Sequence, residues 1–142
     1  MDKKLAIALL LGLVTATGIW LLEISTPYGL GLIDDAISYI AAARALLSGL
    51  GFTRIWLATG LEPITHWPPG YPATLATISY LLKIDPYRSA RFLNMLVFGG
   101  NAALLFWLGS KITKSYLWGM LLSLLFLSNS AILRLHAQAL SE

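Results

Sequence analysis

Long apolar runs separated by short polar segments dominate this chain. The first run, Leu5 to Leu22, contains no charged residue. At about 1.5 Å rise per residue it covers roughly 27 Å as a helix, close to the thickness of a bilayer's hydrocarbon core. Two later runs, Phe92 to Gly109 and Tyr116 to Leu133, are similarly long and apolar. The pattern predicts an all-α, polytopic membrane protein with three transmembrane helices, at about residues 5–22, 92–109 and 116–133.

Composition supports a membrane environment. Of the 142 residues, 57% are hydrophobic and only 12% are charged, whereas about 25% are charged in a typical soluble domain. The mean hydropathy is +0.72. The absence of cysteine excludes a disulfide framework, a thiolate nucleophile and a cysteine-based zinc site. The net charge of +3 is too small and too scattered to indicate nucleic-acid binding.

Lysines predict the orientation of the spans. Lys3 and Lys4 precede the first run, and Lys111 and Lys114 lie in the short link between the second and third. Positive residues concentrate on the cytoplasmic side of membrane proteins. We therefore expect an integral protein of the cell membrane with a cytoplasmic N-terminus. Residues 23–91 then form a long outer loop, and the segment from residue 134 onward is outside too.

A cleaved signal peptide is the alternative explanation of the first run, because a basic start, an apolar stretch and small residues at 16–18 are all present. The apolar run continues to Leu22, beyond any such cleavage site, and Trp20 suits the interfacial belt of a span. We expect this segment to be a retained span.

The outer loop is predicted to contain two juxtamembrane helices. Asp34 to Gly49 begins with good helix-starting residues and ends at a glycine. A helix that is apolar over most of its circumference must lie along the membrane surface or against other helices. A proline-rich turn, residues 66–72, leads into the segment Tyr71 to Ile84, which is too short to cross a bilayer. We interpret it as an interfacial helix, because a fourth crossing would place the Lys111 link outside, against the charge rule.

Asp34 and Asp35 are adjacent carboxylates at the predicted start of the first loop helix. One interpretation is helix capping, in which a carboxylate accepts a backbone N–H and favours the positive helix end. The other is chemical, with one carboxylate acting as a general base or metal ligand while its neighbour orients it. The two residues alone leave both interpretations open.

Several basic residues suit phosphate or lipid headgroups. Lys83, Arg88 and Arg91 follow the interfacial helix, where they could contact headgroups or hold the phosphate of a lipid-linked donor. His66 could donate a hydrogen bond to a phosphate or could be an ordinary interfacial histidine. A single histidine provides no metal-binding spacing.

Asn94 and Asn101 lie seven residues apart in the second span, beside Gly99 and Gly100. Amides and small residues at such spacing are typical of helix–helix contact in lipid. We therefore expect this face of the second span to pack against another helix.

Taken together, these elements resemble the N-terminal module of the GT-C membrane glycosyltransferases. The closest branch is protein-mannosyltransferase-like and includes lipid-A galacturonosyl and aminoarabinose transferases. The resemblance covers almost the whole chain and rests on the order of its motifs after the first span: residues 34–39 (DDAISY), 43–52 (ARALLSGLGF), 67–72 (WPPGYP) and 90–94 (ARFLN).

The resemblance implies an enzyme that transfers a sugar from a polyprenyl-phosphate donor to a lipid or protein acceptor on the outer side of the membrane. The catalytic carboxylate of the first outer loop matches Asp35 best, because Tyr39 follows it by four residues. Ala36 replaces the glutamate of the usual pattern, and a variant with two aspartates before alanine keeps Asp34 as a candidate. Glu142 matches a second acidic residue that follows the third span.

The resemblance also implies that Arg91, with Lys83 and His66, holds the donor phosphate. A divalent metal is compatible with the family, although the sequence indicates no site for it. Such enzymes have many more spans, so the chain matches only their N-terminal part, and we expect residues 1–142 alone to be inactive. The alternatives are a small non-catalytic three-span subunit of a larger membrane complex and, less favoured because the spans hold no charge, a piece of a transporter.

Overall fold

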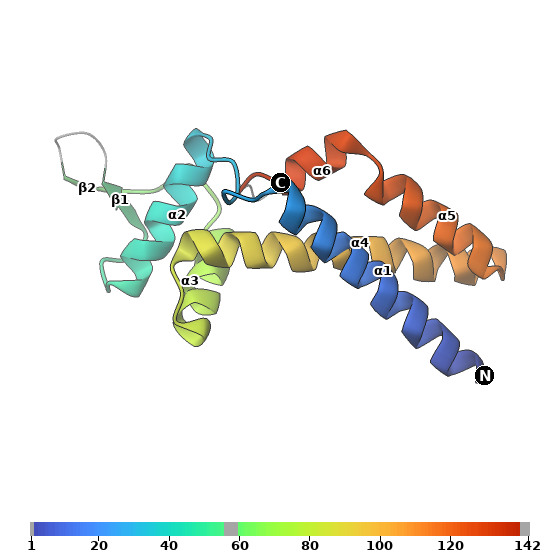
Figure 1. Ribbon diagram of the computed structural model, residues 1–142. Helices are drawn as coiled ribbons and strands as arrows, with labels where there is room; N and C mark the ends of the chain where they lie inside the picture. The colour runs from blue at the N-terminus through green and yellow to red at the C-terminus, as the bar shows by residue number, and fades with distance from the viewer. Residues whose placement is uncertain (1, 56–59, 140–142) are drawn as a thin grey trace. The chain divides into compact units, whose positions relative to one another are not determined.

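The computed structural model describes residues 2–55 and 60–139. This part of the chain is mostly helical, as the apolar pattern predicts. In chain order (Figure 1) the elements are α1 (Lys3–Ser25), α2 (Asp34–Leu47), β1 (Thr53–Ile55), β2 (Leu61–Pro63), α3 (Gly70–Leu82), α4 (Pro86–Thr113), α5 (Tyr116–Leu127) and α6 (Ser130–His136).

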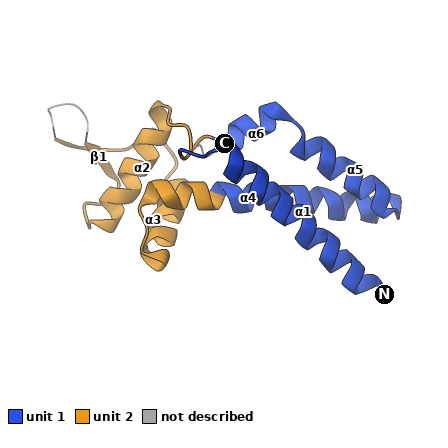
Figure 2. Cartoon of the chain, in the orientation of Figure 1, with its two compact units in different colours: residues 1–28, 94–137 blue, residues 29–93, 138–142 orange. Residues whose placement is uncertain are grey.

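The chain divides into two compact units (Figure 2). Unit 1 comprises residues 1–28 and 94–137, and unit 2 comprises residues 29–93 and 138–142. Both units are therefore built from segments that are far apart in the sequence. Helix α4 contributes its first turns to unit 2 and the remainder to unit 1.

The helices of unit 1 suit a membrane. Within the described residues, α1 and α4 are each long and apolar enough to cross a bilayer, and α5 with α6 could form a third, bent crossing. This confirms a mostly helical chain with two candidate spans, or three if the bent pair is one crossing; the sequence predicted three. The sidedness derived from the lysines stays a prediction.

Helix α4 begins well before the predicted span. It starts at Pro86, and the backbone N–H of Tyr87 donates a hydrogen bond of 2.9 Å to the Asp85 carboxylate. Proline suits a first helical turn, and an aspartate before it suits the cap. The predicted start at Phe92 is where the sequence becomes apolar. An apolar run marks the part of a helix that can lie in the membrane, and the helix itself can begin earlier.

The third apolar run is not the one continuous helix expected at 116–133, although the two helices that replace it could still form one bent crossing. Helices α5 and α6 meet at an angle of 65°. The Asn129 side chain accepts hydrogen bonds from the backbone N–H groups of Ala131 and Ile132, at 3.0 and 3.2 Å, and so caps α6. A polar side chain that satisfies a helix start offers the backbone an alternative to continuing the preceding helix.

Helices α1 and α4 approach closely through glycine. A Cβ atom added to Gly18 would lie 2.7 Å from the Cα atom of Gly99. Phe98 and Phe106 are fully buried in the apolar cluster of this unit. The Asn94 side chain donates a hydrogen bond of 2.8 Å to the carbonyl of His136. These contacts confirm the predicted packing for Asn94 and Gly99. Gly100, which was expected on the same face, is exposed, and a Cβ atom added there would meet nothing within 4 Å.

In unit 2, α2 closely matches the helix predicted for residues 34–49, and it is followed by Gly49 in the left-handed region at φ 75°. The two-stranded hairpin was not predicted and is a small addition to a mostly helical chain. Strands β1 and β2 are antiparallel with Arg54 opposite Glu62. Each strand has three residues, which is too short to give an alternating pattern that can be recognised.

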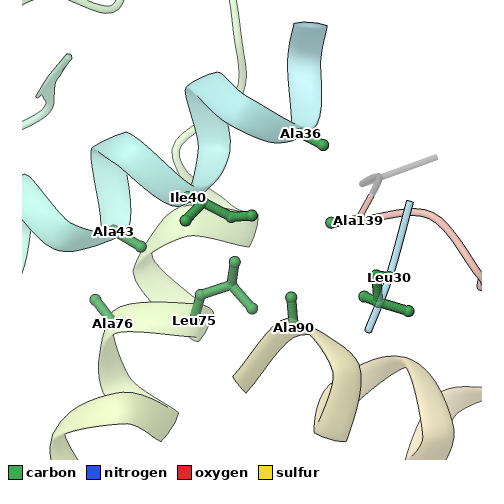
Figure 3. Packing of buried hydrophobic residues seen from close by; sticks show 8 residues of the cluster. All are labelled: Leu30, Ala36, Ile40, Ala43, Leu75, Ala76, Ala90 and Ala139. Carbon is green, nitrogen blue, oxygen red and sulfur yellow. The ribbon is translucent and has the colours of Figure 1, made fainter. Parts of the chain in front are cut away.

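The core of unit 2 lies between α2 and α3 (Figure 3). Leu75 of α3 is fully buried and belongs to one cluster with Ile40 of α2 and Leu30. The Tyr87 hydroxyl donates a hydrogen bond of 2.7 Å to the carbonyl of Leu30. With 13 residues, α3 is about 20 Å long. It is therefore too short to cross a bilayer, as predicted, while its interfacial position stays a prediction.

Candidate functional site

A cavity of about 250 Å³ opens in unit 2 beside the first turns of α2. It is lined by Asp34, Ile37, Ser38, Ala41, Arg54, Ile55 and Trp67. Of the site residues predicted from the sequence, Asp34 lines this cavity, whereas Asp35, His66, Lys83 and Arg91 are not part of its lining. Glu142 lies outside the described residues.

Arg54 is held in one orientation by three neighbours. Its Nη1 donates a hydrogen bond of 2.8 Å to the Ser38 hydroxyl, and its Nη2 lies 3.4 Å from a Glu62 carboxylate oxygen. The guanidinium carbon is 5.0 Å from the centre of the Trp67 ring, within the range of a cation–π interaction. Only 14% of the Arg54 side chain is exposed. The cavity therefore contains a fixed positive charge.

Ser38 connects this cation to the start of α2. Its hydroxyl donates a hydrogen bond of 3.3 Å to the backbone carbonyl of Asp34 while it accepts one from Arg54. A serine hydroxyl can donate one bond and accept others at the same time. Arg54 and the turn that carries Asp34 are therefore linked by one side chain.

The two aspartates differ in their surroundings. Ile33 is the N-cap residue of α2, so the capping interpretation, in which an aspartate occupies the cap, is wrong. Both aspartates lie in the first turn, where the positive end of the helix still favours a carboxylate. Asp34 is exposed and lines the cavity, while Asp35 is half-buried.

A second cavity, of about 270 Å³, adjoins the first and shares Ala41, Arg54 and Ile55 with it. Arg44 lines this second cavity, and its Nε and Nη2 donate hydrogen bonds of 3.0 and 2.9 Å to the two carboxylate oxygens of Asp85. These bonds hold the pKa of Asp85 below its usual value. Arg44 therefore ties α2 to the start of α4, and Arg54 is the cation that both cavities share.

Trp67 is supported by a chain of aromatic rings. The Trp67 and Tyr39 rings are 6.4 Å apart and the Tyr39 and Tyr71 rings 5.4 Å apart, in edge-to-face arrangements that are favourable for aromatic pairs. Burial, with a smaller contribution from Tyr39, raises the pKa of Tyr71 to about 12. The phenol of Tyr71 therefore stays neutral at physiological pH.

The other predicted site residues do not line the cavity beside α2. His66 is exposed, with its Nδ1 3.2 Å from the Thr65 hydroxyl and its ring edge-to-face with Trp67. Lys83 is exposed at the end of α3, and Arg91 is half-buried on α4. Among the described residues, no group of three histidine, aspartate or glutamate side chains could hold a metal ion.

The sequence pattern did not predict Arg54 and Glu62 as residues of the site. They pair across the hairpin, and the hairpin itself was not predicted. The available signal was an arginine isolated in a mainly apolar segment of the outer loop. Trp67 was noted only as part of the proline-rich turn.

No protein-family model, curated protein or solved structure matches this chain. The relation to membrane glycosyltransferases stays a prediction from the order and spacing of the motifs.

Proposed function

We propose that this chain is the N-terminal module of a membrane glycosyltransferase that takes a sugar from a polyprenyl-phosphate donor. The observation that carries the proposal is the cavity beside α2, where the Asp34 carboxylate, the Arg54 guanidinium and the Trp67 indole form one lining. A base, a cation and an aromatic face suit a hydroxyl, a phosphate and a sugar ring, respectively. The order of the sequence motifs supports the same function.

The proposed reaction is a single displacement with inversion. Asp34 accepts the proton of the acceptor hydroxyl as its oxygen attacks the anomeric carbon. The bond between that carbon and the phosphate oxygen breaks, and polyprenyl phosphate leaves with the electron pair. Positive charge near the leaving oxygen stabilises the transition state, and Arg54 is the cation that lines the cavity with Asp34.

The cavity lining favours some of the predicted site residues over others. Asp34 becomes the preferred base because it lines the cavity, whereas Asp35, favoured by the motif alignment, does not. Arg91, Lys83 and His66 stay proposals for binding the donor phosphate in the complete protein. Glu142 stays a proposal for a second acidic residue of the site.

The test uses membranes from cells that make the protein from its own gene. Sugar transfer from a radiolabelled polyprenyl-phosphate donor is compared for Asp34→Asn and Asp35→Asn, two isosteric changes at adjacent positions. Loss of a general base lowers the rate on the order of 10²–10⁴-fold, so Asp34→Asn is expected to be nearly inactive while Asp35→Asn retains most activity. Protein abundance in the membrane fraction serves as the folding control.

The result also separates enzyme from subunit. Full activity of the Asp34→Asn, Asp35→Asn double variant would contradict the catalytic assignment and favour the non-catalytic subunit. Loss with Asp35→Asn alone would return the role to the residue favoured by the motif alignment.

A further inference from the structure

Another cavity lies in unit 1, at the end where α1 begins with Lys3 and where α4 carries Lys111. It has a volume of about 320 Å³ and is lined by Ile7 of α1, by Phe106, Trp107, Ser110 and Lys111 of α4, and by Tyr116 of α5. Three helices contribute to it, and most of its lining is apolar. At roughly 30 Å³ for a group the size of a water molecule, it accommodates about ten such groups.

The cavity contains a cation held beside an aromatic ring. The Lys111 Nζ atom lies 4.7 Å from the centre of the Trp107 ring, which is a cation–π distance. Lys111 is exposed, so its ammonium group remains accessible. The Ser110 hydroxyl is buried and has no hydrogen-bond partner among the described residues.

Lysines outnumber acidic residues around the cavity, where Asp2 is the N-cap of α1. Lys3 lies four residues before Ile7, on the same face of α1. Lys114 follows α4 directly. Clusters of lysine beside a span attract anionic lipid headgroups, at about 1 kcal/mol for each residue.

The aromatic residues indicate the depth of the cavity in a bilayer. Trp107 and Tyr116 are each 41% exposed, and both line the cavity. Tryptophan and tyrosine concentrate at the level of the headgroups, where one part of the ring is in apolar and another in polar surroundings. The mouth of the cavity is thus expected where a phosphate group would lie, with the apolar lining toward the acyl chains.

We propose that this cavity binds one anionic phospholipid, with its phosphate against Lys111 and the upper part of an acyl chain along Ile7 and Phe106. The occupant is a lipid rather than a soluble anion because most of the lining is apolar. The lipid is expected to be anionic because the polar groups of the lining are the Lys111 ammonium and the hydroxyls of Ser110 and Tyr116. The inference is independent of the glycosyltransferase proposal.

The test compares two lysines of equal charge at the same end of the protein. The purified full chain is placed in zwitterionic nanodiscs, and brominated phosphatidylglycerol is titrated in while quenching of tryptophan fluorescence is measured. Lys111→Gln is expected to weaken saturable quenching about fivefold. Lys114→Gln removes the same charge at a residue outside the cavity lining, so it is expected to weaken the saturable quenching much less. Lys111→Arg should retain binding.

Several outcomes would overturn the proposal. Equal quenching by brominated phosphatidylcholine would show that the site does not select an anionic headgroup. Equal losses for Lys111→Gln and Lys114→Gln would show general surface attraction rather than a site. Complete competition by soluble glycerol phosphate, at the concentration that saturates with lipid, would identify a soluble-anion site instead.

Discussion

Replacing Gly99 by alanine tests the close contact of α1 with α4. A Cβ atom at this position would lie 2.6 Å from the backbone oxygen of Thr15 and 3.1 Å from the Ile19 side chain. Ordinary contacts of this kind are about 3.5 Å or longer. Because a backbone oxygen cannot rotate away, the two helices must separate by several tenths of an ångström.

The magnitude follows from the lost packing along the whole contact. A gap of about 0.5–1 Å removes a quarter to a half of the attraction between facing atoms, and overpacking in a dense core costs about 1–3 kcal/mol. Phe98 and Leu22, both fully buried, lie in the cluster that would be opened. We expect Gly99→Ala to lower the free energy of unfolding by an amount in this range.

Gly100→Ala provides the matched control. A Cβ atom there would have no neighbour within 4 Å, and both changes raise helix propensity by the same amount, about 1 kcal/mol. The difference between the two variants therefore isolates the steric effect. It is measured by reversible denaturant unfolding in detergent micelles, followed by circular dichroism. Equal midpoints and slopes for the two variants would refute the proposed contact.

Three further predictions concern unit 2. Leu75 is fully buried, so Leu75→Ala should lower the free energy of unfolding by about 2–5 kcal/mol. Tyr80 is 76% exposed, so Tyr80→Ala should have little effect, and equal effects of the two changes would contradict the assigned core. Tyr71→Phe should leave stability at neutral pH unchanged or raised, because the buried hydroxyl has no hydrogen-bond partner among the described residues. Burial raises the pKa of Tyr71 from 10.0 to about 12, so the phenol loses its proton more readily in the unfolded chain, and the free energy of unfolding falls as pH rises from 10 toward 12. Denaturant unfolding between these pH values should show a smaller decline for Tyr71→Phe. Asp85→Asn should cost less than about 1 kcal/mol at neutral pH, because the pair with Arg44 is largely exposed. Arg44 lowers the pKa of Asp85, so the stability that this ion pair contributes is present at neutral pH and is lost as pH falls through the lowered pKa. The thermal unfolding temperatures of the wild type and Asp85→Asn should therefore converge in acid. A difference that stays constant with pH would contradict the ion pair.

The sequence was informative where structure depends on local pattern. Long apolar runs and a helix ending at Gly49 are properties of neighbouring residues, and the structure has helices at all these positions. The packing role of Asn94 could also be predicted, because an amide within an apolar helix needs a partner. Which partner it has, the carbonyl of His136, depends on how the chain returns after α5.

Other features depend on contacts between distant residues. Gly99 and Gly100 are indistinguishable in sequence, yet only the first would collide with α1 on gaining a side chain. The pairing of Arg54 with Glu62 requires the hairpin register. The choice of Asp34 over Asp35 as the residue lining the cavity depends on where β1 and Trp67 lie relative to α2.

The backbone bond between Ala139 and Gly31 has a consequence for biosynthesis. The Ala139 N–H donates a hydrogen bond of 3.3 Å to the Gly31 carbonyl, and Ala139 is fully buried in the same cluster as Leu30. The ribosome synthesises helices α2 to α6 between these two segments, so this core cannot be completed until residue 139 has emerged. Closing so long a loop is entropically slow. Helices α2, α3 and the start of α4 can pack around Leu30 before residue 139 emerges, whereas the part of the core that Ala139 covers closes last.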